Sequence, residues 1–252
     1  MKYLRYTLLS LALLGAPSDA SASPTTQDFL SRRIMTLIGN GPFARRLYGE
    51  TRRERRRHAR AHASSILRAA EMARPHWESI AVHAGWEDFD VDRDLPALIA
   101  SLTWNESRFR NVVGRRGRAP SETIPDHGRF AIGPMQVLVP SSLAADCGIR
   151  GRQGAARALN NLDLAYRAGA CLLTQFFEHA ALRDYPTRMG WQQRVSGTRQ
   201  FFTENPELQS FLPVERYNWG PHDLHDHPHA GHYPARALAH YYHFHPTNEC
   251  HP

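Results

Sequence analysis

The feature that most constrains the fold is a stripe of apolar residues at helical spacing that ends on a carboxylate. Leu95, Ile99 and Leu102 recur at intervals of three or four residues, the period of one buried face of an α-helix. Asp94-Leu-Pro supplies a helix start, because a proline in the first turn lacks an N–H that would have no partner there. The same spacing reaches Glu106, where the pattern predicts another core side chain. The stripe therefore predicts a helix that holds a carboxyl group against apolar neighbours.

Two interpretations of Glu106 follow from this position. A carboxyl group in apolar surroundings resists ionisation, so its pKa rises toward the working pH, which suits a proton donor. A glutamate at a helix end can equally turn into solvent and take no part in chemistry. The motifs that follow along the chain favour the first interpretation.

Further helices are predicted from capping residues and apolar spacing. Ser141 is a typical N-cap for a short helix over Leu143–Asp146, which Gly148 would end. Asn161 and Asp163 open a long helix whose small side chains let a neighbour approach closely. The apolar face of this long helix consists of Ala165, Ala168, Gly169, Leu172 and Phe176.

The chain as a whole is predicted to be mainly α-helical. A final helix is expected over Pro234–Tyr242, and the alternation of apolar and polar residues that marks strands is scarce. Residues 1–22 are typical of an export signal, with a basic start, a short apolar stretch and small residues for cleavage. Residues 23–72 are expected to form a basic, partly helical N-terminal extension, and residues 73–252 the globular domain. We therefore expect a periplasmic or secreted protein.

Positive charge is concentrated in the extension. The formal net charge is +7 at pH 7. The arginines of the run are Arg52, Arg53, Arg55, Arg56, Arg57 and Arg60. In the cytosol such a run would indicate nucleic acid, but outside it the available polyanions are wall polymers and membrane head groups, so no nucleic-acid partner is expected. The run is either a solvated helix face or a tether to an anionic wall or membrane surface. The extension could instead fold back on the domain through Ile66, Ala70 and Met72.

Three cysteines in an exported chain favour one disulfide and one remaining thiol. Cys147 with Cys171 is the favoured pair, because one residue ends a short helical segment and the other lies in the next helix. Cys250, near the end of the sequence, leaves two other pairings open.

A histidine-rich segment precedes the last predicted helix. It contains His222, His225, His227, His229 and His232, with Asp223 and Asp226 between them. Imidazole and carboxylate groups together can hold zinc or nickel, but this spacing matches no fixed metal signature. A polar loop is the favoured interpretation, and no metal or cofactor is assigned.

Four motifs follow one another in a characteristic order. They are Glu106-Ser-Arg-Phe109, Gly133-Pro-Met-Gln-Val137, Asn161-Leu162 with Gly169-Ala-Cys-Leu172, and Tyr217-Asn-Trp-Gly-Pro221. In this order they resemble the catalytic domain of the soluble lytic transglycosylases, which share a lysozyme-like fold with goose-type lysozyme and cut the glycan strands of peptidoglycan. The chain departs from the family pattern at Pro134, where leucine is usual, and at Trp219, where alanine is usual. The stretch between the first two motifs is also longer than in the family.

The resemblance implies roles for the motif residues. Glu106 would be the single catalytic acid and base, which protonates the bond between N-acetylmuramic acid and N-acetylglucosamine and then takes the proton of the C6 hydroxyl, so that a 1,6-anhydro ring closes. Gln136 would bind a sugar N-acetyl group and Met135 would supply an apolar wall. Ser107 would fix the helix end or contact a sugar. Tyr217 and Asn218 would contact the substrate or the carboxyl group, although Asn-x-Gly-Pro is also turn chemistry.

Two alternatives remain open. Glu122, Asp126 or Asp146 could supply a second carboxylate that activates water, which would make the enzyme a lysozyme-type hydrolase. The chain could also be a non-catalytic wall-binding or assembly protein with the same fold. Peptidoglycan strands are the expected partner, and a secretion or conjugation machinery that needs an opening in the wall is a second one.

Overall fold

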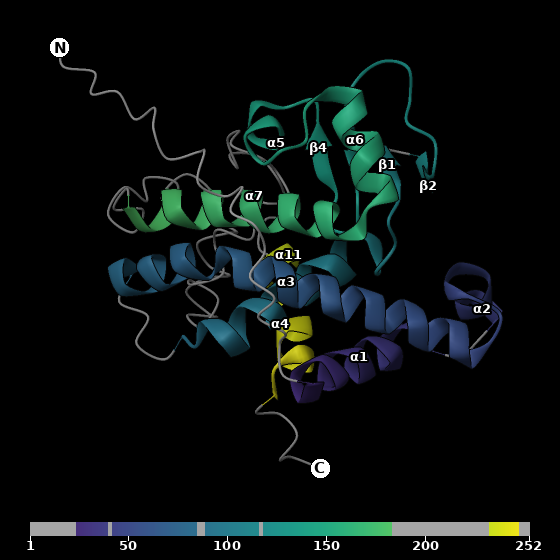
Figure 1. The fold of residues 1–252 in the computed structure, drawn as a ribbon, viewed down its shortest axis with the longest axis horizontal. Helices are drawn as coiled ribbons and strands as arrows, with labels where there is room; N and C mark the ends of the chain where they lie inside the picture. The colour runs from purple at the N-terminus through teal and green to yellow at the C-terminus, as the bar shows by residue number, and fades with distance from the viewer. Residues whose placement is uncertain (1–23, 40–41, 85–88, 116–117, 183–231, 247–252) are drawn as a thin grey trace.

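The computed structural model describes residues 24–39, 42–84, 89–115, 118–182 and 232–246 (Figure 1). Most of these residues are helical, and the rest of the regular structure is one small antiparallel sheet. The expectation of a mainly α protein is therefore confirmed. The described helices are α1 (Pro24–Ile38), α2 (Pro42–Tyr48), α3 (Arg52–Ala84), α4 (Val91–Ser107), α5 (Ser142–Asp146), α6 (Gly151–Asn160), α7 (Leu162–Leu182) and α11 (His232–Phe244). In this part of the chain no helix is long and apolar enough to cross a membrane.

The centre of the molecule is the pair α3 and α7, which run side by side (Figure 1). Small residues on both helices allow this close approach, and they are fully or almost fully buried. They are Ala59, Ala63, Ala69, Ala70 and Ala73 on α3, and Ala165, Ala168 and Ala170 on α7. Trp77 closes one end of the interface, where its indole N–H donates a hydrogen bond of 2.9 Å to Thr174 Oγ1. The pair forms a continuous apolar core on which the other helices pack.

The predicted boundary at residue 72 falls inside α3. Pro75, which was expected near the start of a separate domain, lies within this helix, and buried residues occupy both sides of the boundary. Ile66 and Trp77 are both fully buried and belong to the same core. The described part of the extension is therefore integral to the fold, as the fold-back alternative requires, and the predicted separation at residue 72 is not observed.

Helix α1 forms the first part of the extension that was predicted over residues 23–72. It packs against α3 and buries Leu30, Ile34 and Ile38. These three residues recur every fourth position, so the periodicity was present in the sequence. Residues 1–22, the predicted export signal, lie outside the described residues.

Helices α4 and α11 pack together, although more than a hundred residues separate them in sequence. Ser101 Oγ on α4 donates a hydrogen bond of 2.5 Å to the carbonyl of Ala237 on α11. Asp94, buried near the start of α4, accepts a hydrogen bond of 2.6 Å from Nε2 of His245. The contacts place the predicted C-terminal helix beside the helix that carries Glu106.

The sheet is the main element that the sequence did not predict. Its strands are β1 (Val113–Arg115), β2 (Arg118–Ser121), β3 (Phe130–Ile132) and β4 (Val137–Val139), in the antiparallel order β2-β1-β3-β4. Strands of three or four residues are too short to show the alternation that identifies a strand from sequence. The sheet carries the segment that follows Glu106 to the second motif.

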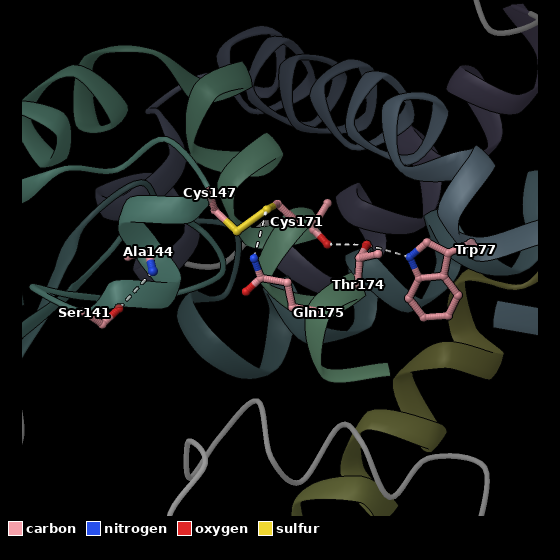
Figure 2. The surroundings of a disulfide bond; sticks show 8 residues. Trp77, Ser141, Ala144, Cys147, Cys171, Thr174 and Gln175 are labelled. Atoms are coloured by element: carbon pink, nitrogen blue, oxygen red, sulfur yellow. Dashed lines mark hydrogen bonds between the residues drawn. A yellow bond between two sulfur atoms is a disulfide. The ribbon is translucent and has the colours of Figure 1, made fainter. Parts of the chain in front are cut away.

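The helix α5 and the disulfide confirm two local predictions. Ser141 Oγ accepts a hydrogen bond of 3.0 Å from the N–H of Ala144, as expected of an N-cap. Cys147 forms a disulfide with Cys171 on α7, which fastens the end of α5 to the central helix pair (Figure 2). The favoured pairing is therefore the one observed. Cys250 lies outside the described residues.

Candidate functional site

Glu106 lies near the end of α4, one turn beyond the stripe that predicted this helix. Leu95, Ile99 and Leu102 are each fully buried, as the spacing required. Glu106 itself is partly buried. The carboxyl group therefore stands where a buried helical face emerges toward the surface, which is a geometry compatible with contact to both the core and a ligand.

The chain turns sharply directly after this helix. Arg108 and Phe109 have φ angles of 55° and 58°, so two consecutive residues with side chains adopt the left-handed conformation that glycine normally occupies. The N–H of Arg108 caps the helix by donating to the carbonyl of Trp104 at 3.1 Å. Such a corner stores backbone strain and persists only where surrounding contacts hold it.

Two side chains from the N-terminal region hold this corner. The Tyr48 hydroxyl, at the end of α2, donates a hydrogen bond of 2.8 Å to the carbonyl of Arg108. His58 Nε2, on α3, lies 2.8 Å from the carbonyl of Phe109. Because a carbonyl can only accept, His58 must carry its proton on Nε2. We call these two contacts the corner clamp.

Burial keeps both members of the corner clamp neutral. It raises the pKa of the Tyr48 hydroxyl, an effect that the nearby Arg110 and Arg108 partly oppose. Burial also lowers the pKa of His58, against the opposing effect of its hydrogen bond to Phe109. Neutral donors hold the two carbonyls without placing a charge in the interior.

A second buried pair lies behind the clamp. His62 Nδ1 and the hydroxyl of Tyr166 on α7 are 2.6 Å apart. Both groups are fully or almost fully buried, and burial lowers the pKa of His62 well below its ordinary value and raises that of Tyr166 well above it. The rings of His58 and His62 also lie against each other, with centroids 4.4 Å apart.

The sequence analysis missed the clamp and the pair behind it. A signal for them exists, because His58, His62 and Ile66 recur every fourth residue and so share one face of α3. The many arginines of this region led to the prediction of an exposed extension, so the buried face of α3 was not recognised.

Ser107 serves the helix end. It is almost completely buried, and its hydroxyl donates to the carbonyl of Thr103 at 3.3 Å. The same oxygen accepts a hydrogen bond of 3.1 Å from the N–H of Arg110. Of the two roles expected for Ser107, its position supports the fixing of the helix end.

The structure ties the second motif to the segment after Glu106. The carbonyl of Val112 accepts hydrogen bonds from the N–H of Gly133, at 3.0 Å, and from Nε2 of Gln136, at 3.1 Å. Gln136 Nε2 also donates to the carbonyl of Gly133 at 2.8 Å. Both hydrogens of the amide are therefore used in shaping the turn. Its Oε1 lies against Gly114, where an added Cβ would clash with that oxygen.

Met135 occupies the core rather than an exposed wall. Its side chain is fully buried and packs on α7 at Gly169, where an added Cβ would come within 2.5 Å of the methionine sulfur. The second and third motifs thus meet through a close contact between a glycine and a methionine. An apolar wall for substrate, the role expected for Met135, is not what this position supplies.

The remaining predicted residues divide into two groups. Glu122, Asp126 and Asp146 are exposed, and Asp126 forms an ion pair of 3.0 Å with Arg152. Tyr217, Asn218 and the histidine-rich segment 222–231 lie outside the described residues. Within the part of the chain that the structure describes, no three histidine, cysteine or acidic residues lie close enough to hold a metal ion.

Comparison with known proteins identifies no relative of this chain. No family model matches the chain, and no curated protein or solved structure shows significant similarity to it. The described residues define a mainly helical protein with a small antiparallel sheet.

Proposed function

We propose that this chain is an exported peptidoglycan lytic transglycosylase with Glu106 as its acid and base, periplasmic or secreted in location. One observation carries the proposal: a partly buried glutamate stands at the end of a fully buried helical stripe. The strained corner directly after it supports the same conclusion, because backbone strain held by buried contacts is typical of functional sites.

The proposed reaction needs one carboxyl group. Protonated Glu106 gives its proton to the glycosidic oxygen as the bond to the anomeric carbon of N-acetylmuramic acid breaks. The resulting carboxylate takes the proton of the C6 hydroxyl, whose oxygen bonds to the anomeric carbon and closes the 1,6-anhydro ring. The carboxyl group is thereby returned to its protonated state, and no water is consumed.

The structure also bears on the hydrolase alternative. A hydrolase of the inverting type needs a second carboxylate on the far face of the sugar to activate water. Glu122, Asp126 and Asp146 are exposed, and Asp126 already pairs with Arg152. Their positions favour solvated carboxylates, so we retain the single-carboxylate mechanism.

The test is digestion of purified sacculi by the full chain and by Glu106→Gln. The amide keeps the shape of the side chain but has no transferable proton, so we expect turnover to fall by about 10²-fold or more. Glu178→Gln, an identical change at an exposed position on α7, is the matched control and should keep full activity. Unchanged turnover in Glu106→Gln would sink the proposal.

Mass spectrometry of the products separates the alternatives. We expect 1,6-anhydro ends on the released fragments. Reducing ends throughout would indicate a hydrolase, and loss of activity in Glu122→Gln, Asp126→Asn or Asp146→Asn would identify its second carboxylate. Binding to sacculi without any cleavage by the unaltered chain would indicate a non-catalytic wall-binding protein.

A further inference from the structure

Two adjoining grooves along the N-terminal half of α3 are lined mainly by arginine. The first has a volume of about 430 Å³ and is lined by Arg52, Arg53, Arg56, Arg57 and Arg60. The second, of about 590 Å³, lies between α3 and α1, where Arg32, Met35 and one acidic residue, Asp28, contribute to its wall. Arg52, Arg56 and Arg60 line both grooves and so form a ridge between them.

The structure divides the arginine run into inward and outward members. Arg55 is buried, and its guanidinium donates hydrogen bonds of 2.9 Å to the carbonyls of Gly49 and Glu50. The other five side chains are exposed. This stretch of α3 thus holds one arginine in the fold and leaves the other five available to a ligand.

None of the outward arginines takes part in an ion pair among the described residues. Hydrogen bonds from Thr51 and the nearby charge of Arg57 lower the pKa of the carboxyl group of Glu54, within the run. Its Oε2 accepts from the N–H of Thr51, and its own N–H donates to Thr51 Oγ1, which caps the start of α3. Like charges four residues apart on a helix repel each other. Arg52, Arg56 and Arg60 repeat this unfavourable spacing, which a bound anion would relieve.

We propose that the arginine grooves bind a linear polymer that carries phosphate groups. Guanidinium forks match phosphate oxygens, and the ridge repeats every four residues, about 6 Å along the helix. A groove can admit a chain, whereas a bilayer surface is flat. None of the described residues that line the grooves has an aromatic side chain on which a nucleobase could stack. The ligand is therefore recognised through its phosphate backbone, independently of any wall-cutting activity.

The test measures binding of inorganic polyphosphate to the full chain over a series of salt concentrations. The variant R52Q/R56Q/R60Q removes the ridge. The matched control R150Q/R157Q/R236Q removes the same charge from exposed arginines on or beside α6 and on α11. We expect the ridge variant to lose at least about tenfold in affinity and about two units of the slope of log Kd against log salt. The control should stay within about twofold of the unaltered chain.

Equal losses in both variants would overturn the proposal, because they would reflect net charge alone. So would tight binding to vesicles of anionic phospholipid without binding to polyphosphate, or tighter binding to a single-stranded oligonucleotide of equal charge. Circular dichroism verifies that the triple variants fold. If the ridge variant does not fold, the single change Arg56→Glu replaces it, and unchanged affinity in that variant would equally overturn the proposal.

Discussion

The left-handed corner at Arg108 and Phe109 shows how single residues position the candidate site. Tyr48 and His58 each donate one hydrogen bond of 2.8 Å to a carbonyl of this corner, two and three residues after Glu106. Both donors come from the region expected to be a separate extension. We therefore expect them to be positioning residues, which act on Glu106 through the backbone and not on a substrate.

We predict that Tyr48→Phe and His58→Phe each lower the free energy of unfolding by about 1–3 kcal/mol, because each leaves a carbonyl of the corner without its donor. We also expect kcat on sacculi to fall by at least about tenfold with little change in KM, since small shifts of a catalytic group are costly. Urea unfolding and steady-state kinetics measure the two effects. His58→Gln, which keeps an N–H donor, should recover most of the activity. Reduced stability with unaltered kcat would restrict the clamp to a structural role.

The change in stability of Gly169→Ala shows whether helix propensity or overpacking dominates at this position. Alanine is the better helix former, so propensity alone predicts a gain of about 1 kcal/mol from Gly169→Ala. Its Cβ would however meet Met135, with 2.5 Å to the sulfur and 2.7 Å to the methionine Cβ, and overpacking costs about 1–3 kcal/mol. We therefore expect net destabilisation in urea unfolding. Met135→Ala combined with Gly169→Ala should cost less than the sum of the single changes, and strict additivity would contradict the contact.

At the scale of elements, α3 joins two regions that were predicted from the sequence to be separate, the basic extension and the globular domain. Its outward face carries the arginine ridge, and its inward face carries His58, His62 and the small residues that pack on α7. One continuous helix of 33 residues thus joins a charged surface, the corner clamp and the core. Changes to the surface and changes to the fold can be told apart by which face they touch.

A truncated chain tests whether residues 73–252 can fold without the N-terminal helices. Removal of residues 1–72 deletes α1, α2 and more than half of α3, including the fully buried Ile34, Ala59 and Ile66. Each buried isoleucine contributes about 2–5 kcal/mol, so the loss is comparable with the whole stability of a typical domain, about 5–15 kcal/mol. We expect no cooperative thermal transition in this truncation. Removal of residues 1–23, which leaves every described helix, is the control. A folded chain beginning at residue 73 would restore the two-part organisation.

At the scale of the molecule, buried histidines make stability depend on pH. Burial lowers the pKa of His58 and His62 below the ordinary value of 6.5, and also lowers that of His240 and His243 on α11. At pH values just below 6.5 the unfolded chain therefore binds more protons than the folded one. These histidines contribute fully to the free energy of unfolding above pH 6.5, where they are neutral in both states. That contribution is lost as the pH falls from 6.5 toward the lowered pKa values of the folded protein.

We predict that the free energy of unfolding decreases between pH 7 and pH 5, by at most about 1.4 kcal/mol per pH unit for each histidine. Urea unfolding at several pH values measures this slope, and His62→Gln should make it shallower. Asp94 and Asp163 do not obscure the effect. Hydrogen bonds outweigh the influence of burial and lower their pKa values below 3.8, so they act in a more acidic window. A stability that is flat across this range would refute the prediction.

The elements that could be predicted from the sequence are those with local causes. The helix that carries Glu106, the cap at Ser141 and the buried face of α7 follow from spacing and capping, because a 3.6-residue period and a side chain that accepts an N–H act within a few residues. Cys147 and Cys171 could be favoured as a pair from their places in successive helices, but only the fold brings their Cα atoms within 5.7 Å.

Tertiary structure decided what depends on distant partners. Strands of three residues exist because their neighbours pair with them, and the predicted domain boundary is absent because residues on both sides of it contact α7. Tyr48 and His58 reach the corner after Glu106 across 60 and 51 residues of chain. The spacing of His58, His62 and Ile66 places them on one face of α3 but does not identify their partners. The free energy that fixes those contacts comes from burial and hydrogen bonds between segments that meet only in the folded molecule.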